Sequence, residues 1–218
     1  MHGAETLGLE VPQFLARLQK EGLKTLPGTA AEILSDDIRD IICPDKLNTR
    51  QWMDVVEAAH KLGMPTTSTI MFGHVDQYRH WGIHLLNLLN VQSRTGGISE
   101  FVPLPFVADE APMYRRGQSR RGPTLREAVL MHAVSRLVLS PQILNIQTSW
   151  VKMGLEGAKL CLRSGANDIG GTLMNESITR AAGAQHGQEM TPETLEAAIT
   201  ACNRRPFQRN TYYKLAVA

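Results

Sequence analysis

The sequence predicts an α/β protein of about five strand–helix units, built as the C-terminal part of a (β/α)8 TIM-type barrel. Short apolar or β-branched runs alternate with amphipathic helical segments, which is typical of a parallel sheet covered by helices. Polar, glycine-containing segments follow the strands, where such barrels carry their chemistry. Because these units cannot close a barrel and the first element is a helix, we expect the first three units to be missing. A doubly wound open sheet is the alternative.

Hydrophobic periodicity arranges the elements in one domain, residues 1–218, with an irregular tail over 204–218. Helices are predicted over 9–21, 30–34, 36–42, 49–62, 78–91, 124–139, 154–163 and from 192 onward. Strands are predicted over 23–26, 65–73, 100–107, 143–150 and 166–169. Thr49 and Thr124 are the expected caps of their helices, and Glu127 completes a capping box with Thr124.

The composition is that of an ordinary soluble globular protein, with 43% hydrophobic and 20% charged residues. A net charge of +2 indicates no basic field for a nucleic acid, and no apolar run approaches the ~20 residues that span a bilayer. Cys43, Cys161 and Cys202 are too far apart in the sequence to indicate a disulfide framework or a metal-ligand spacing. We therefore expect a cytoplasmic protein with no nucleic-acid or membrane partner and no metal site.

The stretch over residues 165–187, GANDIGGTLMNESITRAAGAQHG, is too polar and too rich in glycine to be core. It follows a short predicted strand, and a long polar loop at that place is where an α/β enzyme keeps its site. Its glycines let the backbone approach a ligand closely. The alternative is a solvated connection in which Asn175 or Ser177 caps a short helix.

Six runs of the sequence resemble a known family over nearly the whole chain, from about residue 3 to 209. They are PGTAAEIL (27–34), ICPDKLNT (42–49), AHKLGMPTTSTIMFGHVD (59–76), EFVPLPF (100–106), IQTSWVKMG (146–154) and GANDIGGTLMNESITRAAGAQHGQEM (165–190). The family is that of the radical S-adenosylmethionine enzymes, and specifically the deazaflavin (FO) synthase component that joins L-tyrosine to 5-amino-6-(D-ribitylamino)uracil. The run NDIGGTLMNESI is specific to it, whereas GTAAEIL is shared with enzymes of the futalosine pathway of menaquinone synthesis.

The resemblance implies a radical S-adenosylmethionine barrel that transfers the 4-hydroxybenzyl group of L-tyrosine to the aminouracil, using S-adenosylmethionine and a 4Fe-4S cluster. It also suggests the cyclising component of FO synthase as a partner. The cluster in this family is held by a Cys-x3-Cys-x2-Cys loop, and that motif is absent from this sequence. Cys43, Cys161 and Cys202 do not replace it, because three thiolates on one cluster need a short loop or a convergent fold. We therefore expect a chain that lacks its N-terminal portion and is inactive by itself.

Two alternatives stay open beside the tyrosine-dependent transferase. One is a radical enzyme of the menaquinone branch, acting on an enolpyruvyl or futalosine-derived substrate. The other is a binding module without catalysis, left by loss of the cluster segment. Ligand binding without turnover, or a dimer covering the open sheet edge, would indicate the module.

The resemblance assigns one set of residues to S-adenosylmethionine. Glu32 would accept hydrogen bonds from the ribose hydroxyls, with a first-turn glutamate on the helix dipole as the alternative. Thr69, Met71 and Gly73, at the end of the predicted strand 65–73, would pack on the adenine. Asp76 is expected to fix the following turn.

A second set is assigned to the substrates and the reaction. Tyrosine and the ribityl pyrimidine need cations, carboxylates and amides together, and the substrate set is Gln147, Ser149, Trp150, Lys152, Asn167 and Asp168. Trp150 would stack on a ring or be a core tryptophan, and Lys152 would bind substrate or pair with Asp168. The catalytic set is Asn175, Glu176 and His186, with His186 as the candidate for proton transfer. His132 is expected to be a satisfied core histidine.

Overall fold

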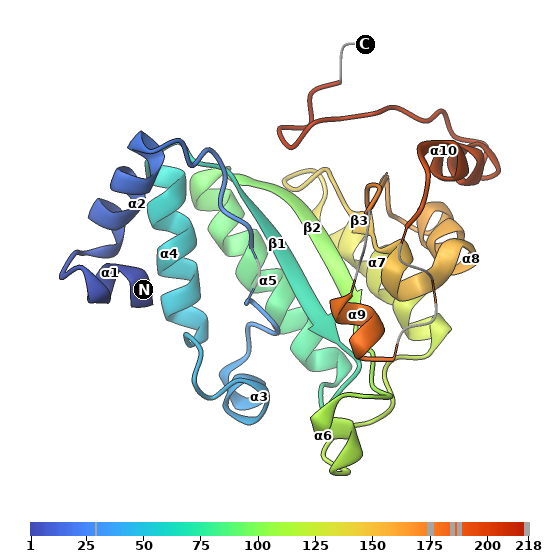
Figure 1. The fold of residues 1–218 in the computed structure, drawn as a ribbon, viewed down its shortest axis with the longest axis horizontal. Coiled ribbons are helices and arrows are strands. Elements are labelled where there is room, and N and C mark those ends of the chain that lie inside the picture. Colours follow the sequence, from blue (N-terminus) through green and yellow to red (C-terminus); the bar gives the residue numbers. More distant parts are fainter. Residues whose placement is uncertain (29, 174–176, 184–185, 187–188, 216–218) are drawn as a thin grey trace.

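The structure, a computed structural model, describes residues 1–28, 30–173, 177–183, 186 and 189–215. It is a mixed α/β chain with parallel strands, as predicted (Figure 1). Strand β1 (Thr66–Phe72) pairs in parallel with β2 (Ile98–Pro105), and β3 (Gln147–Thr148) pairs in parallel with β4 (Asp168–Ile169). A parallel bridge from Phe101 to Ile146 joins the two pairs, and another from Leu26 to Thr66 places the run before Leu26 beside β1. The α/β class is thus confirmed, whereas the described strands do not by themselves form a closed barrel.

Ten helices are described, and several of them pack along the strands (Figure 1). Their bounds are α1 (His2–Thr6), α2 (Val11–Lys20), α3 (Asp36–Ile42), α4 (Thr49–Lys61), α5 (Tyr78–Thr95), α6 (Pro112–Arg115), α7 (Leu125–Leu139), α8 (Trp150–Arg163), α9 (Ile178–Ala181) and α10 (Pro192–Thr200). The predicted α3 and strand β1 are confirmed, as is the capping box between Thr124 and Glu127 at the start of α7. None of the helices in these ranges combines the length and apolar character that a bilayer crossing requires.

The predicted helix over 30–34 is wrong. Ala30 and Glu32 have positive φ values of 63° and 46°, which no right-handed helix contains. The segment instead wraps around the guanidinium of Arg39, which donates hydrogen bonds to the backbone carbonyls of Ala31 and Ile33. A tertiary contact therefore overrides the helical propensity of the run AAEIL.

Other predicted boundaries shift for local reasons. The run 23–26 contributes only the bridge at Leu26. The strand predicted over 143–150 shrinks to two residues, which lie between a turn over 141–143 and the start of α8 at Trp150. Helix α8 carries a kink at Gly154, with φ 66° and ψ 172°. The cap of α4 is Asn48 and not Thr49, because the Asn48 side chain accepts from the N–H of Gln51 at 2.8 Å.

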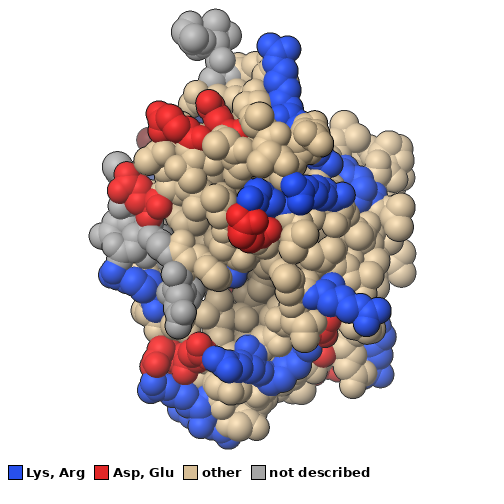
Figure 2. All heavy atoms as spheres, turned by 90° about the vertical axis from the view of Figure 1, so that its right-hand side faces the viewer, with Lys and Arg blue, Asp and Glu red and all other residues tan. Residues whose placement is uncertain are grey.

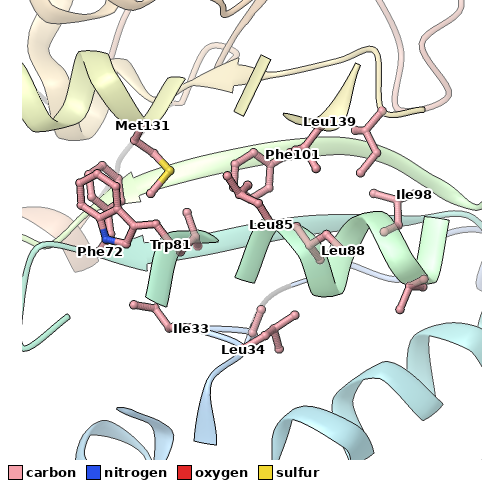
Figure 3. Packing of buried hydrophobic residues seen from close by; sticks show 14 of the residues in the cluster. Ile33, Leu34, Phe72, Trp81, Leu85, Leu88, Ile98, Phe101, Met131 and Leu139 are labelled. Carbon is pink, nitrogen blue, oxygen red and sulfur yellow. The ribbon is translucent and has the colours of Figure 1, made fainter. Parts of the chain in front are cut away.

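The main core lies between the strands and helices α5 and α7 (Figure 3). Phe72 of β1 packs edge-on against Trp81 of α5, with ring centroids 5.2 Å apart, and Phe101 of β2 is fully buried in the same cluster. Side chains alternate across a strand, so Met71 and Glu100 point away from these helices. We call this opposite side of the strands the inner face, and it carries the side chains of Thr69, Met71, Glu100, Gln147 and Asp168.

Candidate active site

A buried carboxylate holds the turn that follows β1. Asp76 accepts hydrogen bonds from the backbone N–H groups of Gly73 (2.8 and 3.0 Å) and His74 (2.7 Å), and from the indole of Trp81 (2.5 Å). Gly73 has a φ of +97°, and a Cβ there would lie 2.2 Å from Pro123. The turn therefore requires glycine, and Asp76 fixes it in the way that the sequence indicated.

His74, in the same turn, is a neutral structural histidine. Its Nε2–H donates to the carbonyl of Met71 at 2.9 Å, and its Nδ1 accepts from the N–H of Val75 at 2.8 Å. Burial lowers the pKa of His74, although the carboxylate of Asp76 acts in the opposite direction. Both ring nitrogens are thus occupied in ordering the carboxyl end of β1.

Glu32 lies beside this end of β1. Its backbone carbonyl accepts from the N–H of Met71 at 2.9 Å, and its carboxylate pairs with Lys46 at 2.7 Å. Because the backbone at Glu32 is not helical, the alternative role as a first-turn glutamate is wrong. The carboxylate remains 18% exposed, and its assignment to the ribose of S-adenosylmethionine stays a prediction.

The hydroxyl of Thr69 is engaged by the protein. It donates to the carbonyl of Gly28 at 3.1 Å, while the N–H of Gly28 donates to the hydroxyl of Thr67 at 2.8 Å. A Cβ at Gly28 would lie 1.8 Å from the carbonyl oxygen of Thr67, so only glycine permits this approach. Thr69 therefore shapes the wall beside β1, and Met71 supplies a half-buried apolar side chain next to it.

An open cavity of about 190 Å³ lies at the carboxyl ends of β2 and β3, between the loop after β2 and the first turns of α7 and α8. Its walls include Phe106, Pro123, Leu125 and Met153 together with the predicted substrate residue Lys152. Ion pairs order the neighbouring loop: Arg120 pairs with Glu127 at 2.7 Å and Arg121 with Asp109 at 3.2 Å. Basic and acidic side chains are interspersed over the molecular face shown in Figure 2.

A polar cluster occupies the inner face near the amino ends of the strands. Gln147 donates to Asp168 at 3.0 Å and to Glu100 at 3.2 Å. Arg209 and Tyr213, from the chain after α10, contact both carboxylates, with 2.8 Å from the Tyr213 hydroxyl to Asp168 and 3.3 Å from Arg209 to Glu100. We call these five residues the inner-face cluster. It contains two of the predicted substrate residues, Gln147 and Asp168.

Burial dominates the electrostatics of the inner-face cluster. It raises the pKa of the Glu100 carboxyl, which Tyr213 and Arg209 act to lower. Burial and the neighbouring carboxylates raise the pKa of the Tyr213 phenol. Sequence reasoning missed Glu100, Arg209 and Tyr213. A charged residue opening the apolar run EFVPLPF was the one signal for Glu100, whereas nothing in the sequence pattern marked the other two.

Three further predicted substrate residues have structural contacts. The indole of Trp150 is 1% exposed and donates to the carbonyl of Gly171 at 3.0 Å, as a core tryptophan does. The amide oxygen of Asn167 accepts from Arg136 at 2.6 Å and from the N–H of Ile146 at 2.8 Å, which fastens β3 to β4. Ser149 is the N-terminal cap residue of α8. The assignment of all three to substrate stays a prediction, and the contacts of Trp150 and Asn167 do not favour it.

Among the predicted catalytic residues, only His186 belongs to the described part of the chain. It is exposed, and its Nδ1 lies 2.8 Å from the place that a Cβ on Gly154 would occupy, at the kink of α8. Asn175 and Glu176 lie outside the described residues. The segment over residues 177–183 contacts the loop after β2, because the backbone N–H of Glu110 donates to the carbonyl of Ala182 at 3.1 Å.

Two other buried histidines, His84 and His132, are engaged through one ring nitrogen only. The Nδ1 of His84 accepts from the N–H of Leu34 at 3.0 Å, and burial lowers the pKa of His84 to about 3. The Nδ1 of His132 contacts the carbonyl of Ala128 at 2.8 Å, and burial lowers its pKa to about 4. The Nε2 of each has no hydrogen-bond partner in the described part of the chain, so His132 is only half satisfied.

The thiols of this chain do not fit an iron–sulfur cluster. Cys43, Cys161 and Cys202 are free and buried, and burial raises the pKa of the first two. Cys161 and Cys202 share one apolar cluster, to which Cys43 does not belong. Over the described ranges no group of three or more His, Cys, Asp or Glu side chains could hold a metal ion.

Parallel strands in chain order carry a built turn, a carboxylate and a cavity near their carboxyl ends, which is the edge where α/β folds bind ligands. Residues 95–217 match the family described as the CofH/MqnC C-terminal region. Because this match covers more than half of the sequence, the chain belongs to that family. The family implies radical S-adenosylmethionine chemistry with an iron–sulfur cluster.

Named relatives are similar over almost the whole chain. A 5-amino-6-(D-ribitylamino)uracil–L-tyrosine 4-hydroxyphenyl transferase of Methanocaldococcus jannaschii is 46% identical over 98% of this chain and 59% of its own length. The transferase of the same name from Archaeoglobus fulgidus is 47% identical over 99% of this chain and 62% of its own. The FO synthase of Streptomyces coelicolor is 49% identical over 98% of this chain. The chain spans about three fifths of the archaeal relatives and 25% of the Streptomyces protein.

Proposed function

We propose that this chain supplies the substrate-binding and S-adenosylmethionine-binding half of an enzyme of deazaflavin (FO) biosynthesis. The reaction is transfer of the 4-hydroxybenzyl group of L-tyrosine to 5-amino-6-(D-ribitylamino)uracil. The observation that carries the proposal is the 46–49% identity to proteins named for this transfer and for FO synthesis, over nearly every residue of the chain. At this level of identity, the site residues of those proteins can be matched to residues of this chain position by position.

The carboxyl ends of the strands suit S-adenosylmethionine. Glu32 would accept from the ribose hydroxyls, and its ion pair with Lys46 holds the carboxylate at the rim. Met71 and the Gly73 turn would form the apolar wall for the adenine, with Thr69 and Gly28 keeping that wall in shape. S-adenosylmethionine supplies the radical that starts the reaction. No residue set described here binds the cluster, so we propose that turnover requires a segment carrying Cys-x3-Cys-x2-Cys.

The substrates would be held between the cavity and the inner face. The cavity is lined in part by Phe106 and Met153, whose side chains suit an aromatic ring, and Lys152 gives it a cationic group for a carboxylate. Gln147 and Asp168 present an amide and a carboxylate, which suit the hydroxyls and amide edge of the ribityl pyrimidine. Asn175, Glu176 and His186 are proposed to serve the reaction itself, with His186 transferring a proton.

The test joins this chain to a radical S-adenosylmethionine segment that carries Cys-x3-Cys-x2-Cys. With S-adenosylmethionine, a reductant and both substrates, we expect the joined protein to form the coupled product and this chain alone to form none. Substitution Asn175→Ala or Glu176→Gln in the joined protein should abolish coupling. The proposal is wrong if coupling is unchanged in both variants, or if no product forms from tyrosine.

The menaquinone branch is the second candidate, because the matching family covers both branches in its description. Product from a futalosine-derived substrate, with none from tyrosine, would favour that branch. Assaying both substrates with the same joined protein separates the two candidates directly. A partner that cyclises the coupled product is part of the first candidate and is assayed by adding it to the same mixture.

A further inference from the structure

The last described part of the chain crosses the amino ends of the strands. After α10 the chain runs back over this end of the molecule, opposite to the loops that form the cavity (Figure 1). Arg204 anchors it by donating to the carbonyl of Ala166 at 2.8 Å, two residues before β4 begins. Although residues 204–215 contain no helix or named strand, they hydrogen-bond to residues of two strands, Asp168 of β4 and Glu100 of β2.

Residues 209–215 form a closed loop built around one asparagine. The N–H of Asn210 donates to the carbonyl of Lys214 at 2.9 Å, and its side-chain oxygen accepts from the N–H groups of Tyr212 (2.9 Å) and Lys214 (3.1 Å). Arg209 stacks over the ring of Tyr213 at 4.0 Å. The loop therefore presents a guanidinium and a phenol together, and these two groups enter the inner-face cluster as a unit.

The loop contributes hydrogen-bond donors to the two carboxylates of the inner-face cluster. Glu100 and Asp168 both contact the amide nitrogen of Gln147, which has two hydrogens for two carboxylates. Without further donors these two carboxylates would face each other across a half-buried site, which is unfavourable. Arg209 brings a positive charge to both of them, and Tyr213 brings one hydroxyl hydrogen between them. The loop thus supplies the donors that make this arrangement stable.

We propose that residues 209–215 are a C-terminal clasp, in which Arg209 and Tyr213 are positioning residues for Gln147 and Asp168. The clasp closes the amino end of the inner face and fixes the positions of both side chains there. The role toward substrate rests on the proposed function, whereas the clasp itself does not. Arg209 and Tyr213 act through Asp168 and Glu100, so neither has to touch a substrate.

The first experiment uses this chain and needs no activity. The side-chain amide of Gln147, assigned in a nitrogen-15 correlation spectrum with Gln147→Ala, reports the position of that residue. In the wild type we expect a shifted and exchange-protected amide. In Tyr213→Phe and Arg209→Met it should move to the position of an exposed glutamine, and trypsin should cleave after Arg204 at least about tenfold faster. Tyr212→Phe, at the exposed neighbouring ring, is the matched control and should change neither quantity.

The clasp is refuted if the Gln147 amide and the cleavage rate of both variants equal those of the wild type. The second experiment measures the kinetics of this chain joined to the segment that carries Cys-x3-Cys-x2-Cys. Tyr213→Phe should raise KM for a substrate at least about fivefold with kcat within about twofold, because binding groups are displaced and reacting groups are not. Unchanged KM beside a displaced amide would overturn the positioning role. If the wild-type joined protein forms no product, the proposed function has failed, and the amide and the cleavage rate still decide the clasp.

Discussion

Replacing Asp76 by asparagine should destabilise the fold far more than its near-identical shape suggests. Both carboxylate oxygens accept hydrogen bonds at a site with no solvent exposure: Oδ1 from the N–H groups of Gly73 and His74, and Oδ2 from Gly73 and Trp81. An amide keeps one oxygen. If it serves the turn, the new NH2 group faces the indole N–H of Trp81, which lies 2.5 Å from Oδ2, and two donors then oppose each other.

The expected magnitude follows from these contacts. Loss of one hydrogen bond to a charged group costs about 1.5–3 kcal/mol, and the buried indole N–H left without an acceptor costs a further 1–3 kcal/mol or so. We therefore expect Asp76→Asn to lower the free energy of unfolding by about 3–5 kcal/mol. In a Trp81→Phe background the opposing donor is absent, so the same substitution should cost about 1–3 kcal/mol less.

Urea unfolding followed by far-ultraviolet circular dichroism measures all four proteins of this double-mutant cycle, and it does not depend on the fluorescence of Trp81. Trp81 also packs on Phe72 and Tyr78, so the single variant Trp81→Phe corrects for lost ring contacts. If the two substitutions add within about 0.5 kcal/mol, the indole is not a partner of Asp76 and this reasoning fails.

Three further predictions concern single features of the fold, each measured by urea unfolding. Gly28→Ala should lower the free energy of unfolding by at least about 3 kcal/mol, because the new Cβ would lie 1.8 Å from a backbone carbonyl oxygen. The control Gly82→Ala, in open space on α5, should raise the free energy of unfolding by about 0.5–1 kcal/mol. Equal effects of the two substitutions would contradict the close approach at Gly28. Burial lowers the pKa of His132 to about 4, whereas the pKa in the unfolded chain is about 6.5. The neutral form of His132 therefore contributes stability above pH 6.5 or so, and this contribution is lost as the pH falls toward 4. His132→Leu should therefore flatten the pH dependence in this window, and an unchanged slope would show that His132 takes up its proton in the folded state. Thr124→Ala should lower the free energy of unfolding by about 1 kcal/mol, because it removes the cap of α7. Thr49 is not a cap, so Thr49→Ala should leave the start of α4 intact. A larger cost at position 49, with frayed amide exchange in the first turn of α4, would contradict the assignment of Asn48 as the cap.

The sequence by itself determined the α/β class, the long helices and the strand TTSTIMF, because these depend on periodic burial that repeats along a continuous segment. It also determined the Thr124 cap and the glycine turn after β1, since both use residues within three positions of each other. The family resemblance was carried by the same continuous runs, and the match over residues 95–217 confirmed it.

Tertiary contacts alone decided the conformation of residues 30–34 and the composition of the inner-face cluster. The helix-forming run AAEIL is held in another conformation by Arg39, whose guanidinium needs the carbonyls that a helix would have used. Glu100 and Tyr213 are separated by 113 residues, and Arg209 and Asp168 by 41. No local pattern encodes such a pairing, because burial of a charge is stable only where the folded chain brings its partner from elsewhere.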